Sequence, residues 1–239
     1  MPESSVEILP SPGEAANAGE TLPSRLAALR QLIAEKFPVC ELKTAGVFAT
    51  GVEAFDRSEG GLRRGAFSEL VGPMSAGGLF IESMLAVVER ERCFAALVDV
   101  GRTFDPQGAN PATLSRLLWV CCGNPMQAVK ATDLLLRDGN LPLIVLDLQS
   151  AAPRELRRIP ASTWHRFQRL AEPTSTALVA LTSQPMIESA SVRIAVRQRW
   201  TLAAMRERRR ELLTRMEAQV FARRPMGVLP AMEGQRRSA

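Results

Sequence analysis

The feature that most constrains the fold is a continuous apolar run near the middle of the chain, LPLIVLDL at residues 141–148. A strand with one face in water alternates apolar and polar side chains, whereas a strand buried on both faces is apolar throughout. The run therefore predicts a central strand of a parallel sheet with helices on both faces.

The flanking sequence alternates strands and helices in the same way. Strand-like runs cover 93–100, 117–122 and 176–182, and apolar residues at helical spacing cover 78–90, 125–139 and 162–170. Asn110 and Asn124 are each followed by a proline, a pair that is typical of a helix start. This alternation predicts an α/β fold with a largely parallel central sheet covered on both faces.

One strand-to-helix turn has the spacing of a phosphate-binding loop without its reactive side chains. Residues 67–71 lead into GPMSAGGL at 72–79, where the motif reads GxxxxGK[ST]. Gly72 and Gly77 keep the spacing, but Gly78 stands at the lysine position and Leu79 at the position of the Mg²⁺-binding hydroxyl. Triphosphate hydrolysis is therefore not expected at this turn. Taken alone, the octapeptide fits an ordinary Gly-Pro turn equally well.

The composition of the 239 residues, 46% hydrophobic and 23% charged, suits one main domain. No apolar run approaches the ~18 residues of a membrane span, and the N-terminus lacks the features of a signal peptide, so we expect a cytoplasmic protein. The cysteines show no C-x-x-C spacing, so neither zinc nor disulfides are expected. They are Cys40, Cys93, Cys121 and Cys122.

The net charge is +5, and arginines concentrate after position 154. This distribution weakly favours an acidic partner such as nucleic acid, and a solvated basic face explains it equally well.

Four regions are expected along the chain. They are a disordered tail over 1–19, an amphipathic helix over 20–38, a core over 39–224 and a flexible tail over 225–239. The helix carries one apolar stripe, which either packs on its own domain or binds a partner. The stripe consists of Leu26, Leu29, Ile33 and Phe37.

Several separated segments, in the same order, resemble the core of RecA-type recombinases. TGVEAFD at 50–56 and GGLRRG at 60–65 resemble the family's TGxxxLD and GGLPRG elements, and ELVGP at 69–73 resembles its strand into the ATP loop. FAALVD at 94–99, with the Asp-Pro pair at 105–106, resembles the strand that bears the catalytic glutamate. LIVLD at 143–147 resembles the Walker B strand, and ASVRI at 190–194 resembles the ASVRL strand. The resemblance covers about 26–221 and implies a RecA-like P-loop core with a C-terminal antiparallel edge hairpin.

The departures from the family concern its activity. Gly101 stands where the family keeps the glutamate that activates water. The family's second DNA-binding loop is reduced to about six residues after Gln184, and the first, over 149–160, is short and carries arginines in place of glycines. The resemblance therefore implies a protein that is not an enzyme. No cofactor is expected, although weak ATP binding by the backbone of the loop stays open.

The resemblance also implies site residues. The degenerate nucleotide site consists of Gly72, Ser75, Gly77, Gly78, Asp147 and Gln184. No metal is expected, because Leu79 replaces the hydroxyl residue that would bind Mg²⁺ together with Asp147. The alternative role of Asp147 is a strand-end cap. Gln184 matches the family's switch glutamine, with a simple hydrogen-bonding role as the alternative. The single histidine, His165, has no assigned role.

The expected nucleic-acid contacts are weak, sequence-independent and based on arginines, which a solvated surface explains as well. They are Arg154, Arg157, Arg158, Arg208, Arg209 and Arg210. The last three lie in a segment with two interpretations. The residue pattern over 201–222 fits a basic amphipathic helix, whereas the resemblance implies a hairpin over 192–221 with its second strand at 214–221, which we favour.

A RecA-like core without these groups is similar to the ImuA (SulA-related) proteins. That resemblance implies an accessory role in damage-induced translesion synthesis through protein contacts. The implied partners are a catalytically inactive relative of Y-family polymerases, an error-prone C-family polymerase, or RecA. The alternative is a divergent ATP-dependent DNA-binding recombinase that uses Lys130, or an arginine from another subunit, in place of the lost groups.

Overall fold

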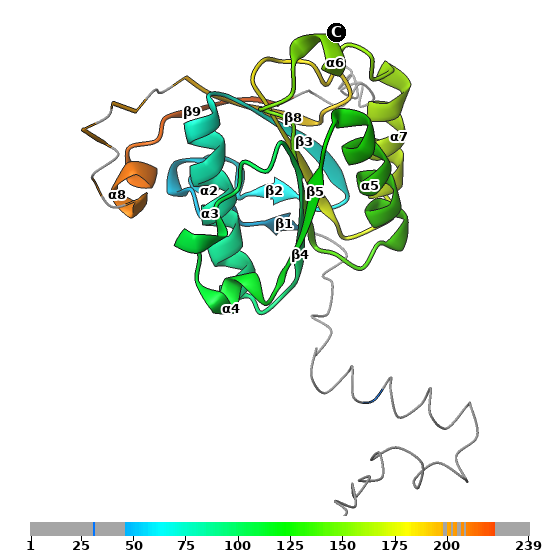
Figure 1. Cartoon of the computed structure of the whole chain (residues 1–239). Helices are drawn as coiled ribbons and strands as arrows, with labels where there is room; N and C mark the ends of the chain where they lie inside the picture. The colour runs from blue at the N-terminus through cyan, green and yellow to red at the C-terminus, as the bar shows by residue number, and fades with distance from the viewer. Residues whose placement is uncertain are drawn as a thin grey trace, which may run out of the picture. The chain divides into compact units, whose positions relative to one another are not determined.

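The structure is a computed structural model of the chain (Figure 1). It describes residues 46–197, 200–201, 203–204, 207 and 209–222, together with Gln31. The chain divides into two units, Met1–Cys40 and Glu41–Ala239, and the sheet and its helices belong to the second. Several predictions lie outside the described residues: both tails, the helix over 20–38 with its stripe, and Arg208.

A seven-stranded sheet forms the centre of this unit, in the order β5-β4-β6-β7-β3-β8-β9. All neighbouring pairs are parallel except β8 and β9, which are antiparallel. The strands are β3 (Ala66–Val71), β4 (Ala95–Val100), β5 (Leu117–Cys122), β6 (Leu143–Asp147), β7 (Ala177–Thr182), β8 (Val192–Val196) and β9 (Ala218–Ala222). The predicted α/β fold with a parallel sheet and an antiparallel edge hairpin is confirmed.

The apolar run that predicted a central strand forms β6. This strand pairs with β4 on one side and β7 on the other, and all five of its residues are buried. Hydrogen bonds on both edges and helices on both faces leave no water-exposed side, which explains the absence of alternation in its sequence.

Helices flank the sheet on two sides, with α2 and α3 on one and α5 and α7 on the other (Figure 1). The helices are α2 (Glu53–Glu59), α3 (Met74–Arg90), α4 (Pro111–Leu114), α5 (Pro125–Asp138), α6 (Pro153–Leu156), α7 (Ala161–Ala171) and α8 (Arg209–Thr214), with a 3₁₀ turn at Pro106–Gly108. A small antiparallel sheet pairs β1 (Val47–Phe48) with β2 (Leu62–Arg63).

Both predicted helix starts are confirmed. The Asn110 side chain accepts a hydrogen bond from the Ala112 N–H at 3.1 Å, and Asn124 accepts one from the Gln127 N–H at 3.0 Å. Each cap satisfies a backbone donor that the first helical turn leaves without an intrahelical acceptor.

Three aromatic side chains join α7 to the sheet. Phe67 on β3 lies 6.2 Å from both Trp164 and Phe167 of α7, between ring centroids, and the latter two rings are 6.0 Å apart. The Gln168 side chain accepts a hydrogen bond from the Phe67 N–H at 2.9 Å. These contacts fix the end of α7 that follows the arginine-rich segment 153–160.

The hairpin that the resemblance favoured is present, with Val192 opposite Ala222 and Val196 opposite Ala218. The helical pattern accounts only for α8, in the connection between the two strands. Thr214, expected in the second strand, instead ends α8. Leu212 in α8 and Met216 directly after it bury their side chains, and the strand begins only at Ala218.

Candidate functional site

The carboxyl ends of the central strands meet at one edge of the sheet, the usual place for ligands in open α/β folds. Gly72 follows β3, Gly101 follows β4, and Asp147 ends β6. The Gly72 N–H donates to the carbonyl of Thr182, at the end of β7, at 3.0 Å. The fold therefore brings the degenerate loop and Asp147 to the same edge.

The degenerate loop is much shorter than predicted, because α3 begins at Met74 instead of near Gly78. The N–H groups of Ala76 and Gly77 donate to the Pro73 carbonyl at 2.9 and 3.2 Å. In a phosphate-binding loop, such N–H groups converge on the anion. Here they form the first helical turn, which begins directly after Pro73 although Gly77 and Gly78 are weak helix formers.

Gln149, which sequence reasoning missed, fills the space beside this turn. Its Nε2 donates to the Gly72 carbonyl at 2.9 Å, and the residue is only 7% exposed. A Cβ added at Gly77 would overlap Oε1 of Gln149 and lie 2.7 Å from its Cδ. Gly77 thus makes room for an amide of the chain itself. The only sequence signal was a polar residue two positions after Asp147.

The other two residues predicted for the loop lie at the surface. Ser75 and Gly78 are exposed, and a Cβ added at Gly78 would meet no atom within 4 Å. Packing therefore requires glycine at position 77 but not at position 78.

Gly101 adopts a backbone conformation that disfavours any other residue. Its φ is +90°, and an added Cβ would lie 2.6 Å from Oγ of Ser150. The Ser150 hydroxyl donates to the carbonyl of Val100, which holds it at that position. A glutamate at position 101 would therefore be strained as well as crowded.

Asp147 is a buried strand-end acceptor. Its carboxylate accepts from the Gln149 N–H at 2.9 Å and from the Thr103 hydroxyl at 3.0 Å. Neighbouring Asp99 accepts from the Thr103 N–H at 3.0 Å and from Nε1 of Trp119 at 3.2 Å. Burial raises the pKa of Asp147 to about 6, and the charge of Asp99 adds to the increase, while the two hydrogen bonds oppose it. This geometry matches the capping role.

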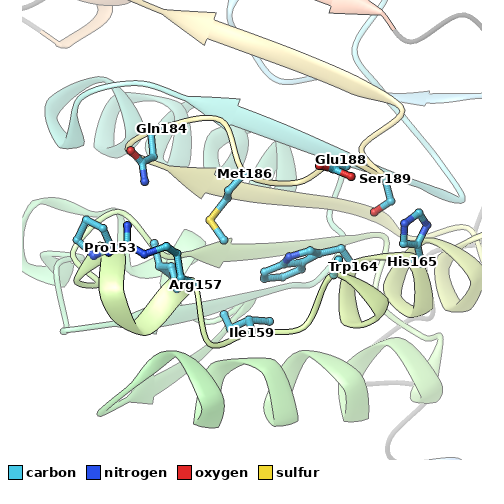
Figure 2. A pocket seen from close by; sticks show the side chains of 11 residues that line it. Pro153, Arg157, Ile159, Trp164, His165, Gln184, Met186, Glu188 and Ser189 are labelled. Atoms are coloured by element: carbon cyan, nitrogen blue, oxygen red, sulfur yellow. The ribbon is translucent and has the colours of Figure 1, made fainter.

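Gln184 is not gathered with the other candidates. A groove beside the loop is lined by Gly72, Gln149 and the two neighbours of Gln184, Ser183 and Pro185. Gln184 itself lines a second pocket, where its side chain lies opposite Arg157 (Figure 2).

Lys130, the substitute for the lost lysine in the alternative hypothesis, also lies elsewhere. It is exposed on α5, which packs on β4, β5 and β6. This helix and α3, which carries the degenerate loop, lie on different sides of the sheet (Figure 1).

The connection between β7 and β8 is short and firmly held, and its anchor, Glu69, was also missed. Buried in the middle of β3, Glu69 accepts from the N–H groups of Met186 and Ile187 at 2.9 and 3.2 Å. It also accepts from the Thr182 hydroxyl at 3.1 Å and pairs with Arg193 at 2.7 Å. The one charged residue in the run AFSELV was the available signal.

The predicted nucleic-acid residues are only partly described. Arg154, Arg157 and Arg158 are exposed on α6 and directly after it. Arg209 and Arg210 begin α8, but their side chains lie outside the described part of the chain.

Within the described residues, no group of three or more His, Cys, Asp or Glu side chains could hold a metal ion. In the same part of the chain, no helix is long and apolar enough to cross a membrane.

Comparison with known proteins finds partial similarity to a RecA protein. A stretch of 110 residues, 44% of this chain, is 31% identical to Protein RecA of Mycoplasmopsis pulmonis (strain UAB CTIP). The chain spans about a third of that protein's length, 32%. No protein-family model matches the chain. The similarity and the parallel sheet with its edge hairpin together support a RecA-like relationship.

Proposed function

We propose that this chain is a non-catalytic RecA-like accessory protein of DNA repair. It acts through protein contacts in error-prone translesion synthesis during the damage (SOS) response. The observation that carries the proposal is Gly101, whose positive φ and close approach to Ser150 disfavour the water-activating glutamate of the RecA-type recombinases.

The degenerate loop supports the same conclusion. A triphosphate needs free N–H groups and a cation at its β- and γ-phosphates. The degenerate loop offers less of both, because the first turn of α3 uses the N–H groups of Ala76 and Gly77, and Gly78 replaces the lysine. Gln149 occupies the remaining space beside Gly77.

The connections after the strands support a protein partner over DNA as the main ligand. The segment that replaces the family's second DNA-binding loop is short, and Glu69 holds it in place. Recognition of a partner is therefore left to the surface of the folded core. By resemblance to the ImuA proteins, we propose as partner a Y-family polymerase relative, an error-prone C-family polymerase, or RecA.

The enzymatic part of the proposal is tested by measuring ATP hydrolysis by the purified full chain, with and without single-stranded DNA. We expect no turnover above background, with RecA as the positive control. Turnover that disappears in an Asp147→Ala variant would refute the proposal, because the activity would then belong to this site.

The adaptor part is tested by co-expressing the chain separately with each of the three partners. We expect at least one stable complex by size-exclusion chromatography. Failure to form a complex with any of the three would contradict the adaptor role.

A further inference from the structure

A pocket between α6, α7 and the connection 183–191 lies away from the degenerate loop (Figure 2). We infer that it binds one bulky apolar side chain of an acidic segment in a partner protein. This inference rests on the proposed role in protein contacts.

The floor of the pocket is apolar and of a suitable size. Ile159, Trp164 and Met186 line it, and the cavity measures about 170 Å³ (Figure 2). Interfaces commonly depend on one large apolar side chain that enters such a pocket. Ile159 and Trp164 are already buried and Met186 is half-buried, so a single leucine, methionine or phenylalanine side chain would fill the cavity and gain van der Waals contacts with this floor.

The pocket is pre-formed on both sides. Trp164 packs against Phe67 and Phe167 of the core. On the opposite side, the backbone of Met186 is held by its hydrogen bond to Glu69. A site that is already ordered requires less conformational entropy to be lost on binding.

The charge next to the pocket selects an acidic partner. Arg157 lines one end, and Arg154 and Arg158 are exposed in and directly after α6, the helix that borders the pocket. None of the three forms an ion pair with a described residue, whereas Arg166 and Arg193 pair with Asp133 and Glu69. Carboxylates flanking the apolar anchor would meet these free guanidinium groups.

The opposite end of the pocket orients the segment. His165, Glu188 and Ser189 lie there, while Arg157 and Gln184 lie at the first end (Figure 2). The Ser189 Oγ is buried and has no hydrogen-bond partner among the described residues. A backbone N–H of the bound segment would satisfy it.

Single-stranded nucleic acid fits the pocket less well than a peptide. Base recognition in such proteins relies on stacking against exposed aromatic faces. Of the two rings that line the pocket, Trp164 is only 3% exposed, which leaves the imidazole of His165 as the exposed one.

The test is selection of a random dodecapeptide library on the full chain, followed by affinity measurements on the enriched peptides. We expect these peptides to share one bulky apolar residue flanked by Asp or Glu. Arg157→Glu and the pocket-filling Met186→Arg are each expected to weaken binding by about tenfold or more. Arg157 and the control Arg63→Glu, on β2, are both exposed, and the control should change affinity less than twofold.

Three outcomes would overturn the inference. The enriched peptides could lack this pattern, or they could bind both pocket variants as tightly as the unmodified chain. Alternatively, Arg157→Glu and Met186→Arg could weaken the binding of an oligothymidine strand and leave peptide binding unchanged. The proposed function can be judged separately. If the polymerase-type partners still bind the pocket variants normally, the accessory role holds and the pocket is not its interface.

Discussion

Gly77 and Gly78 are neighbours in α3, but the structure predicts that alanine has opposite effects at the two positions. At Gly78 an added Cβ meets no atom within 4 Å, and the φ angle is an ordinary helical one. Gly78→Ala should therefore raise the free energy of unfolding by about 0.5–1 kcal/mol, because it restricts the unfolded chain and favours the helix.

Gly77→Ala should be destabilising. The new Cβ would displace the Gln149 amide and break its 2.9 Å hydrogen bond to the Gly72 carbonyl. Leaving a buried group unsatisfied costs about 1–3 kcal/mol, and the helical gain of about 0.5–1 kcal/mol offsets part of it. The net loss is expected to be about 1–2 kcal/mol.

Urea unfolding of the full chain, with linear extrapolation, measures both effects. A double-mutant cycle with Gln149→Ala isolates the contact, because Gly77→Ala should cost little once the amide is gone. Equal effects of the two alanines, or a Gly77→Ala penalty that persists without the Gln149 amide, would refute the proposed packing of Gln149 against the loop.

Three further predictions concern the same edge of the sheet and the arginines. The raised pKa of Asp147 gives stability that is present below about pH 4 and is lost as the pH rises through about 6. Asp147→Asn should therefore stabilise the protein by up to about 3 kcal/mol at pH 7.5, and the difference in stability should vanish near pH 4. Thermal unfolding of the variant and the unmodified chain across this pH range measures the difference, and a difference that does not change with pH would contradict the burial argument. Gly101→Glu should cost at least about 1–3 kcal/mol in urea unfolding, from its φ of +90° and its clash with Ser150, and a neutral result would show that the turn can relax. Any binding of single-stranded DNA should be weak and fall steeply with salt, and nanomolar binding in high salt would exclude a phosphate-only contact. Binding that Arg154→Ala with Arg158→Ala leaves unchanged would show that these arginines are not the contacts.

The elements that could be predicted from the sequence are those specified by neighbouring residues. Burial of β6 followed from its continuous apolar run, and the start of α5 followed from Asn124 and Pro125. Both signals act within a few residues, so one segment contains all the information. For the C-terminal segment, the residue pattern and the family resemblance disagreed, and pairing with β8 decided for the strand.

The residues that were missed act over long separations in the chain. Gln149 contacts Gly72 from 77 positions away, and Glu69 contacts Met186 from 117 positions away. The pairing of parallel strands brings such residues together, Gln149 at the carboxyl edge of the sheet and Glu69 within β3, and no local pattern marks them.

By itself the sequence determined the α/β alternation and the loss of the reactive groups, since Gly78 and Gly101 stand where a lysine and a glutamate would be needed. It left open whether the backbone of the loop could still hold a phosphate. Only the tertiary structure decided how the loop is arranged, because the start of α3 and the position of Gln149 depend on strands brought together from distant parts of the chain. The physical reason is that side-chain identity is a local property, whereas an open anion site requires free N–H groups and empty space, and both depend on what packs there.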